Sequence, residues 1–348
     1  MDNQIWVGPN VLPELARLLA SPAVGQVVVV VDANTVTKCL PLLEPYLPAG
    51  YRVVEIPDGE EYKTLASCET LWAELTEHRA DRHAVVVNLG GGVVTDLGGF
   101  AAAVYKRGVR FVQVPTTLLA QVDASVGGKT GVDFMGFKNQ LGVFQEAAGV
   151  FIDPRFLQTL DLRQLKSGYA EVVKHWLIAD ADAFVRNRSI GIMVDDWTPI
   201  IEESVALKQR IVAQDPLETG LRKLLNFGHT VGHALESYLL QQPGREVLHG
   251  EAVAAGMVCE AWLSHHKGLL SALELDRIET FLFSVFEKIQ FVFLETEAIA
   301  DYARQDKKNT GAVINCTLLE GIGHGVYDQA VTLDEIDQAL RYYHRLPG

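Results

Sequence analysis

The chain of 348 residues has few cysteines, no long hydrophobic run and a deficit of basic residues. Its four cysteines are scattered and form no C-x-x-C pair. Such isolated cysteines are typical of buried thiols in a reducing compartment, and they argue against a disulfide framework. The apolar runs are strand-sized, well short of the about 18 residues that suggest a membrane span. Residues 1–10 lack a basic segment followed by an apolar one, so no signal peptide is expected. The sequence therefore predicts a cytoplasmic protein.

Acidic residues outnumber basic ones, with 44 Asp and Glu against 30 Lys and Arg and a formal net charge of −14. A surface of this sign repels nucleic acid and anionic membranes, so neither is expected as a partner. An anionic small molecule could bind only at a local cluster of Lys and Arg whose positive charge offsets the negative field of the whole protein. The chain also lacks internal repeats, low-complexity tracts and long charged linkers. Any boundary between domains is therefore expected to be short.

Strand-like and helix-like segments alternate in the first 160 residues. Continuous apolar strands separated by helices indicate a mostly parallel sheet with both faces covered. The predicted strands span residues 27–31, 52–56, 84–89, 109–114 and 149–152. The clearest helical patterns between them span residues 65–79 and 95–104.

Amphipathic helical patterns dominate after residue 162, and Thr332 with Glu335 predicts a capping box for the last helix. The predicted helices span residues 163–178, 198–213, 226–239, 250–266, 275–287 and 333–344. The predicted fold class is α/β, with an N-terminal parallel-sheet nucleotide-binding domain over residues 1–160. A mostly helical C-terminal metal-binding domain is expected over residues 161–348, with a site in the cleft between the two.

Three consecutive glycines, Gly90, Gly91 and Gly92, follow the strand at residues 84–89. Glycines at a strand-to-helix turn let backbone N–H groups approach a pyrophosphate at the positive end of the helix. The pattern is not the G-x-G-x-x-G fingerprint, but it favours a nucleotide site over a plain tight turn. Asp96 is expected in the first turn of that helix, either as an acid that stabilises the helix dipole or as an acceptor for a cofactor hydroxyl.

Polar residues gather after the next strand, which Pro115 ends. Ligands of open α/β sheets bind at the carboxyl ends of the strands, where this segment should lie. So many polar side chains among glycines favour a binding loop over an ordinary solvated one. The candidate contacts in this segment are Thr116, Thr117, Asp123, Lys129, Lys138 and Asn139.

Histidines and an acid with helical spacing predict a metal site in the second half of the chain. His229 and His233 lie at i and i+4 on one helical face, and His249 lies beside the start of another helix. A set of one Glu and two His leaves a position open on zinc, as in a catalytic site. The spacing alone does not choose among the possible donors, which are Glu171, His175, His229, His233 and His249.

Taken in chain order, these blocks resemble the bacterial 3-dehydroquinate synthases of the sugar phosphate cyclase superfamily. The resemblance covers nearly the whole chain and is specific only when its blocks are taken jointly. The blocks are residues 90–96, 115–117, 122–131, 138–139, 170–174, 225–233, 249–252 and 306–308. The resemblance implies an NAD-binding domain, a metal- and substrate-binding domain, NAD and zinc or cobalt as cofactors, and a homodimer.

The reaction implied by the resemblance converts 3-deoxy-D-arabino-heptulosonate 7-phosphate to 3-dehydroquinate and phosphate in aromatic amino acid biosynthesis. It comprises transient oxidation by NAD, elimination of phosphate, re-reduction and an intramolecular aldol closure. Because NAD is regenerated, the implied enzyme is a lyase rather than a net oxidoreductase.

The resemblance also implies roles for individual residues. It places the metal on Glu171, His229 and His249, and proton transfer on His233 and Lys174. The other positions that match the substrate site are Asp123, Lys129, Asn139, Lys208, Glu218, Arg222 and Asn226. Lys307 matches a phosphate contact, and Arg107 matches an arginine contributed across the dimer interface. The positions that match NAD contacts are Asp32, Glu60, Lys63, Gly91, Gly92, Asp96, Thr116, Thr117, Lys138, Phe156 and Thr159.

Several alternatives remain open at the level of sequence. Ala124, His175 and residues 133–137 depart from the commoner pattern of the family, and the last of these changes directly precedes Lys138 and Asn139. Other cyclases act on sedoheptulose 7-phosphate or glucose 6-phosphate, and an amino-dehydroquinate synthase would share nearly all the blocks. A metal-dependent polyol dehydrogenase would lack the set of Lys129, Lys138, Asn139 and Lys307. A non-catalytic NAD-binding protein would not need a Glu-His-His site that faces a phosphate cluster.

Overall fold

The computed structural model describes residues 4–135, 137–305 and 314–347. The chain forms two compact units. Unit 1 contains residues 1–161 and 197–209, and unit 2 contains residues 162–196 and 210–348. The expected division into two domains has a single boundary at residue 160. In the structure, unit 1 also includes residues 197–209, most of which belong to helix α8 (Thr198–Gln214). None of the described helices is long and apolar enough to cross a bilayer.

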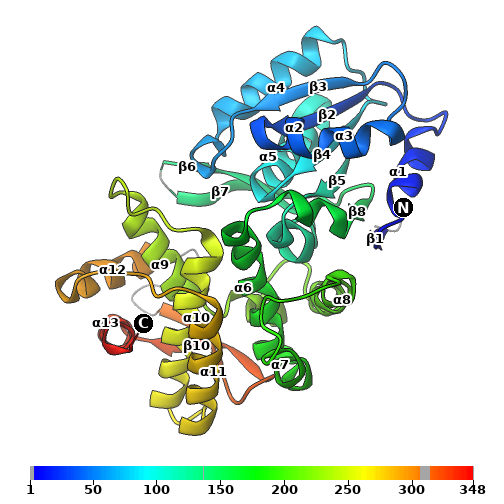
Figure 1. Ribbon diagram of the computed structural model, residues 1–348. Helices are drawn as coiled ribbons and strands as arrows, with labels where there is room; N and C mark the ends of the chain where they lie inside the picture. Colours follow the sequence, from blue (N-terminus) through cyan, green and yellow to red (C-terminus); the bar gives the residue numbers. More distant parts are fainter. Residues whose placement is uncertain (1–3, 136, 306–313, 348) are drawn as a thin grey trace. The chain divides into compact units, whose positions relative to one another are not determined.

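Unit 1 is built on a six-stranded sheet in the order β1-β8-β5-β4-β2-β3, and every pair of neighbouring strands is parallel. Its central strands are fully buried runs of valine, which suit a sheet covered on both faces. Figure 1 shows these strands in blue to green. The strands are β1 (Ile5–Val7), β2 (Val27–Asp32), β3 (Arg52–Ile56), β4 (Val85–Gly90), β5 (Arg110–Pro115) and β8 (Val150–Ile152).

Helices cover both faces of this sheet. Alternate residues of β2 and β4, such as Val29 and Val87, join a buried cluster with Leu12 and Leu15 of α1 and Leu43 of α3. The other face packs against α5, which contacts β2, β4 and β5, while α4 contacts β3 and α5. The predicted parallel sheet is confirmed. The helices of unit 1 before α8 are α1 (Leu12–Leu19), α2 (Ala33–Lys38), α3 (Leu40–Leu43), α4 (Leu65–Glu77) and α5 (Gly92–Val104).

A two-stranded hairpin in unit 1 was not predicted from the sequence. Strands β6 (Lys129–Phe134) and β7 (Phe137–Phe144) are antiparallel, with Gly131 opposite Gly142. A Cβ on either glycine would lie 2.5 Å from a backbone oxygen of the other strand. The glycines that read as a flexible loop in the sequence therefore permit the close approach of two strands.

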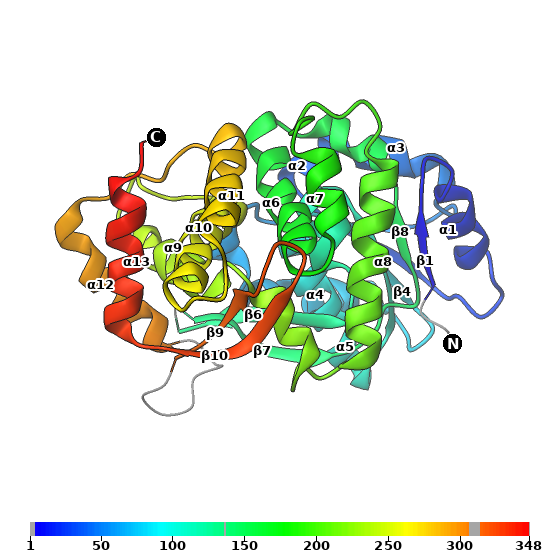
Figure 2. The same ribbon diagram turned by 90° about the horizontal axis from the view of Figure 1, so that it is seen from below.

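Unit 2 is mostly helical, and its centre is α10. This helix contacts α6, α9, α11, α13 and β9, so it is buried on nearly every side rather than on one stripe. A small antiparallel ribbon of β9 and β10 completes the unit, and α13 lies beside α12 (Figure 2). The elements after α6 (Leu162–Ala179) are α7 (Ala181–Asn187), the 3-10 turn η6 (Leu221–Asn226), α9 (His229–Leu240), α10 (His249–His266), α11 (Ala272–Val285), α12 (Thr296–Tyr302), β9 (Ile314–Leu319), β10 (Gly325–Val331) and α13 (Leu333–Arg345).

Helix α9 begins three residues later than the sequence predicted. Asn226 ends the 3-10 turn η6, and Gly228 follows with φ +80, a left-handed conformation that stops a helix from running through it. His229 is therefore the first residue of α9 and His249 is the first residue of α10. The predicted capping box of the last helix is confirmed, because Thr332 Oγ1 accepts a hydrogen bond from Glu335 N at 3.2 Å.

Candidate active site

The order of the sheet in unit 1 reverses between β2 and β4. Strand β2 continues to β3 on one side, whereas β4 continues to β5 on the other. In open α/β sheets, ligands bind at the carboxyl ends of the strands at such a point. The predicted cofactor residues at these strand ends are Asp32 of β2, Gly91 and Gly92 after β4, and Thr116 and Thr117 after β5.

The glycine turn after β4 leaves the start of α5 open to a ligand. Gly91 precedes the helix and provides no side-chain cap for its first N–H groups. A Cβ on Gly91 would lie 3.0 Å from Thr117 Cγ2, so the turn lies tightly against the end of β5. Uncapped N–H groups at the positive end of a 13-residue helix form an anion site. This geometry suits a pyrophosphate.

Two predicted cofactor residues form a buried ion pair beside this turn. Lys63 Nζ lies 2.6 Å from Asp96 Oδ2, and Lys63 is only 4% exposed. Burial lowers the pKa of Lys63, but the charges of Asp96 and Glu60 outweigh it and raise the pKa above its ordinary value. Burial raises the pKa of Asp96, although Lys63 opposes the shift. Because α5 starts at Gly92, Asp96 is not in its first turn, and that expectation was wrong.

The other predicted cofactor residues differ in their surroundings. Glu60 Oε1 lies 3.4 Å from Lys138 Nζ. Asp32 caps α2 by accepting hydrogen bonds from the backbone of the first turn. Phe156 lies in the hydrophobic core of unit 1, and Thr159 donates a hydrogen bond to its backbone oxygen at 2.7 Å. The contacts of Asp32 and Phe156 are those of residues that also stabilise the fold.

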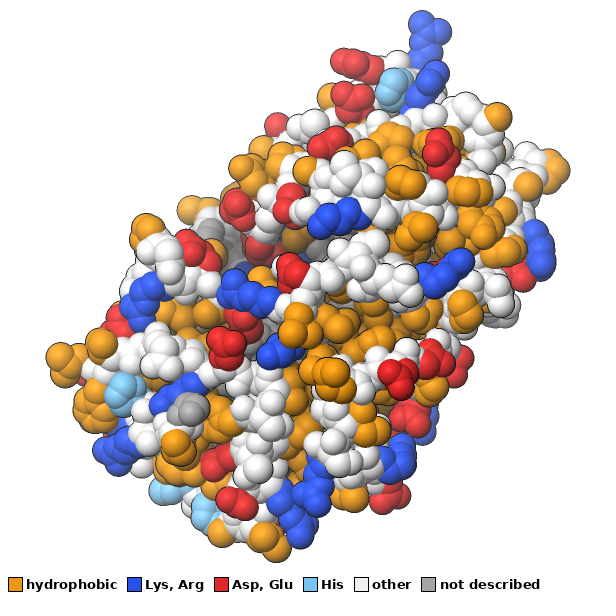
Figure 3. All heavy atoms as spheres, in the orientation of Figure 1, with side chains coloured by type: hydrophobic (Ala, Val, Ile, Leu, Met, Phe, Trp, Pro, Cys, Tyr) orange, Lys and Arg blue, Asp and Glu red, His pale blue; other side chains and the backbone are white. Residues whose placement is uncertain are grey.

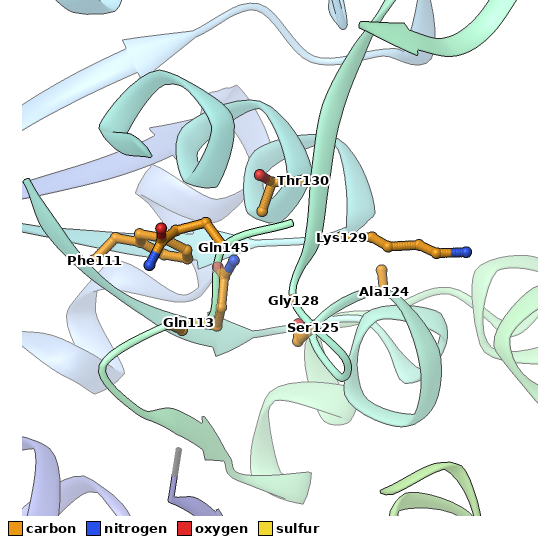
Figure 4. A pocket seen from close by; sticks show the side chains of 9 residues that line it. Phe111, Gln113, Ala124, Ser125, Gly128, Lys129, Thr130 and Gln145 are labelled. Atoms are coloured by element: carbon orange, nitrogen blue, oxygen red, sulfur yellow. The ribbon is translucent and has the colours of Figure 1, made fainter. Parts of the chain in front are cut away.

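Residues that the resemblance assigns to the substrate also lie in unit 1. Asp123 and Lys208 form an ion pair, with 2.7 Å between Oδ1 and Nζ. Asn139 has φ +49 and its N–H donates to Asp133 at 2.6 Å, which fixes the end of the hairpin. Arg107 is exposed and has φ +67. Lys129 borders a hollow of about 10 Å³, which has room for about one water, and its side chain extends away from Gln113 (Figure 4).

The predicted metal site lies where three helices of unit 2 meet. Glu171 of α6 is fully buried, and its Oε1 lies 3.5 Å from Nε2 of both His229 and His249. Both carboxylate oxygens lack a hydrogen-bond partner among the described residues, although Oε2 forms an ion pair with Lys174. Burial raises the pKa of Glu171, but Lys174 and the two imidazoles outweigh it and hold the pKa well below its usual range.

The two imidazoles are oriented through their other ring nitrogen. Nδ1 of His229 lies 3.1 Å from the backbone oxygen of Phe227, and Nδ1 of His249 lies 3.4 Å from Glu236 Oε2. A proton on each Nδ1 would leave each Nε2 as a ligand atom that faces Glu171. Burial lowers the pKa of His249, but Glu236 and Glu171 outweigh it and raise the pKa to about 9. The negative field at this point favours a cation.

His233 is the third imidazole of this cluster. The ligand atoms of His229, His233 and His249 lie within 4.8 Å of one another. The ring centroid of His233 is 5.1 Å from that of His229 and 5.6 Å from that of His249. The geometry thus brings together Glu171, His229, His233 and His249, and it leaves their division into ligands and proton-transfer groups as a prediction.

A folded loop between α8 and α9 holds further predicted residues. Asp215 accepts hydrogen bonds from the backbone N–H groups of Thr219, Gly220 and Arg222, at 2.9, 2.7 and 3.0 Å. Glu218 has φ +59 and accepts a hydrogen bond from Asn226 Nδ2 at 3.0 Å. The buried guanidinium of Arg222 donates to the backbone oxygen of Pro216. Lys307 lies outside the described residues.

Asp215, Glu236 and Glu260 were not predicted from the sequence as site residues. Each of them contacts a predicted site residue or the backbone beside one. Glu236 lies three residues after His233 on α9, a spacing that could have placed it on the same face. Glu260 had no comparable signal because its partners lie on another helix.

On the face shown in Figure 3, acidic and basic side chains are interspersed, and the described residues form no large basic patch there.

Comparisons with known proteins agree with this geometry. Residues 53–167 match the model of the 3-dehydroquinate synthase N-terminal domain, and residues 168–309 match that of the C-terminal domain. A 3-dehydroquinate synthase of Parabacteroides distasonis is 39% identical, with 100% of this chain and 99% of that protein covered. The 3-dehydroquinate synthase of Pseudomonas aeruginosa is 40% identical, with 98% and 94% covered.

Solved structures of other sugar phosphate cyclases are also similar. The 2-epi-5-epi-valiolone synthase of Streptomyces hygroscopicus, with NAD+ and Zn2+ bound, gives a TM-score of 0.83 at 30% identity and covers 99% of this chain and 97% of its own. A 2-deoxy-scyllo-inosose synthase with carbaglucose-6-phosphate, NAD+ and Co2+ gives 0.84 at 25% identity, with 97% and 96% covered. The two family models and the full-length relatives together place this chain in the 3-dehydroquinate synthase family.

Proposed function

We propose that this protein is a 3-dehydroquinate synthase, which converts 3-deoxy-D-arabino-heptulosonate 7-phosphate to 3-dehydroquinate and phosphate. The observation that carries the proposal is the buried Glu171 carboxylate, which faces two imidazole Nε2 atoms beside Lys174 in a chain of this family. The relatives named as 3-dehydroquinate synthases match over essentially their whole length, which supports the same reaction here.

The residues present fit a divalent metal. Two ligand atoms, each about 2.1 Å from a tetrahedral zinc ion, lie about 3.4 Å apart. The observed separation of 3.5 Å between Glu171 Oε1 and each imidazole Nε2 is close to that value. Glu171 Oε1 has no hydrogen-bond partner among the described residues, and a buried acceptor left in this state would cost free energy. We therefore assign Glu171, His229 and His249 to Zn2+ or Co2+, the metals named for the two similar cyclases.

The strand ends of unit 1 fit NAD in the same way. The uncapped start of α5 would accept the pyrophosphate, and the Lys63–Asp96 pair lies one helical turn further along. Bound NAD supplies a reversible hydride acceptor, and a bound metal supplies Lewis acidity that lowers the pKa of a substrate hydroxyl. The protein's own contribution is to bind, orient and exchange protons.

His233 and Lys174 are the residues we assign to proton exchange. His233 lies one turn along α9 from His229, and its ring is close to both predicted imidazole ligands. Lys174 is 1% exposed and contacts Glu171, so its ammonium group stays beside the predicted metal. A positioned acid or base of this kind accelerates proton transfer by roughly 10²–10⁴-fold. Arg222 and Asn226 are assigned to the anionic groups of the substrate.

One assay tests the proposed function. Purified protein with NAD, Zn2+ and the heptulosonate phosphate should release inorganic phosphate without accumulation of NADH. Sedoheptulose 7-phosphate and glucose 6-phosphate serve as matched controls, because they lack the carboxylate and are the substrates of rival cyclases. Turnover of a control substrate in place of the heptulosonate would reassign the protein within the superfamily. Sustained formation of NADH from a simple polyol would make it a dehydrogenase.

A homodimer and a cytoplasmic location belong to the same proposal. Arg107 is exposed at the end of η3 (Tyr105–Arg107), which leaves it able to reach a second copy of the chain. The four cysteines are free and buried, which suits a reducing compartment. Mixing inactive Arg107→Ala protein with inactive His233→Asn protein should restore part of the activity if Arg107 serves the partner's site. Absence of restored activity, with mixed dimers present, would remove Arg107 from the site.

A further inference from the structure

Two helices of unit 2 each begin with a predicted metal ligand, and each is held by a buried carboxylate from the other. Helix α9 starts at His229, and α10 starts at His249. They run antiparallel, because Gly228 lies against Gly256 and Gly232 lies against Ala252. A Cβ on Gly232 would lie 2.9 Å from the backbone oxygen of Ala252, so the two backbones approach closely.

The start of α9 cannot provide its own cap. The residue before the helix is Gly228, with φ +80, and a Cβ there would lie 2.5 Å from the side chain of Met257. The Ser, Thr, Asp or Asn that usually accepts the N–H of the third helical residue is therefore excluded. Glu260 of α10 takes this role. Its Oε1 accepts from Val231 N at 3.0 Å and its Oε2 accepts from Gly228 N at 2.6 Å.

Glu260 thereby fixes the backbone on both sides of His229. It is 0% exposed, and Ser264 Oγ donates to its backbone oxygen at 2.6 Å, so the carboxylate projects from a well-anchored residue. The negative charge also lies at the positive end of α9, where it is stabilised. Movement of Glu260 would move the start of α9 and with it the imidazole of His229.

The reverse contact runs from α9 to the start of α10. Glu236 is 5% exposed and its Oε2 lies 3.4 Å from Nδ1 of His249. A carboxylate that accepts the Nδ1 proton fixes the tautomer and the ring plane, so that Nε2 is presented to the metal. The backbone of α10 is held at the same place, because Gly250 N donates to Ser167 Oγ of α6 at 3.0 Å.

We propose that Glu236 and Glu260 are positioning residues that form a reciprocal clamp, in which each helix orients the histidine at the start of the other toward the metal. The inference rests on the proposed metal site, and it assigns the preorganisation of that site to this helix pair. We assign neither carboxylate to the substrate. Substitution should therefore change how tightly and with what geometry a metal is held.

The test uses the metal-free, full-length protein titrated with Co2+, whose visible absorption bands report the number and geometry of its ligands. Glu236→Gln and Glu260→Gln keep the volume of each side chain and remove its charge. Each should weaken Co2+ binding by about 10–100-fold, the usual effect of losing a partner of a metal-ligating residue, and should alter the absorption bands. The double variant should weaken binding by less than the product of the two single factors, because both act on one helix pair.

A matched control separates positioning from general destabilisation. Thr332→Ala removes the side-chain cap of α13, which should lower thermal stability but leave the affinity for Co2+ unchanged. Glu260→Asp keeps the charge on a shorter stem and replaces Glu260→Gln if that variant does not fold. Wild-type affinity and spectra in both Glu236→Gln and the Glu260 variant would overturn the proposal. If the double variant weakens Co2+ binding by the full product of the two single factors, the reciprocal coupling is overturned. Failure of the wild-type protein to bind Co2+ would instead count against the proposed function.

Discussion

The two units hold their predicted site residues in different ways. In unit 1 several predicted cofactor residues lie at the ends of parallel strands, where the sheet order and a glycine turn suit a ligand. In unit 2 the predicted metal ligands come from three helices, α6, α9 and α10, and buried carboxylates hold them in place. Backbone geometry thus dominates in unit 1 and side-chain electrostatics in unit 2. Substitutions should therefore have separable effects on NAD and on the metal.

The strongest test of this difference removes a metal ligand. Glu171→Gln or His249→Ala should abolish metal retention after dialysis and lower turnover by on the order of 10⁴-fold or more, since the Lewis acid is lost. The affinity for NAD, measured by calorimetry, should stay within about twofold of wild type because the strand ends are untouched. Loss of NAD binding in either variant would contradict the separation of the two units.

His233→Asn is the matched control for these ligand variants. It should retain the metal and lose roughly 10²–10⁴-fold in turnover, the range for a proton-transfer group. The metal content of each dialysed protein decides between the two roles. If His233→Asn loses the metal and His249→Ala retains it, the predicted ligand set is wrong and His233 takes the place of His249 among the ligands.

The fold of unit 1 was largely predictable because its signals are local. Runs of valine at β2 and β4 can bury both faces, and the glycines after β4 mark the turn into α5. Elements without such signals were not predicted. Strand β1 has only three residues, and the β6–β7 hairpin depends on Gly131 meeting Gly142 across the strands, which is a tertiary property.

The metal site was predictable only as a set of candidate donors. Helical spacing placed His229 and His233 on one face, but it could not show that Glu171 lies equally far from His229 and His249. That arrangement depends on how three helices pack. The clamp residues Glu236 and Glu260 were missed for the same reason, since their partners lie on a neighbouring helix.

The second test concerns a charge pair in unit 1, formed by Lys63 and Asp96. Lys63→Met leaves the largely buried Asp96 without its partner, which typically costs about 3 kcal/mol of unfolding free energy. Lys63→Met/Asp96→Asn should recover most of that loss, because the unpaired charge is removed. Urea unfolding at pH 7 measures both, and the metal content should be unchanged.

An exposed ion pair in the same unit is the control for the buried one. Arg17 Nη1 also lies 2.6 Å from its partner, Glu14 Oε2, but the side chain of Arg17 is 72% exposed. Arg17→Met should change the unfolding free energy by less than about 1 kcal/mol. Similar losses for Lys63→Met and Arg17→Met would mean that burial does not strengthen the Lys63–Asp96 pair.

The smallest expected effect is at Asp215, where unit 2 uses a carboxylate to organise backbone, much as glycines do in unit 1. Burial raises the pKa of Asp215, but the N–H groups of Gly220, Thr219 and Arg222 outweigh it and lower the pKa to about 2. A carboxyl group with a depressed pKa stabilises the fold above its unfolded value of 3.8, and this contribution is lost as the pH falls through about 2. Wild-type protein should therefore lose part of its resistance to urea across this window.

Asp215→Asn should lack that part of the pH dependence, because an amide does not titrate there. Its NH2 group cannot accept the hydrogen bonds that Oδ2 takes from Gly220 and Arg222, so the loop that carries Glu218 should shift. We expect KM for the sugar phosphate to rise by about tenfold at pH 7, with metal content unchanged, since small misplacements of binding groups are costly. Thr219→Val removes only the 3.2 Å hydroxyl bond to Asp215 and should leave KM near wild type. Equal KM values for Asp215→Asn and wild type would show that the loop is held by its other contacts, and that Arg222 does not depend on Asp215 for its position.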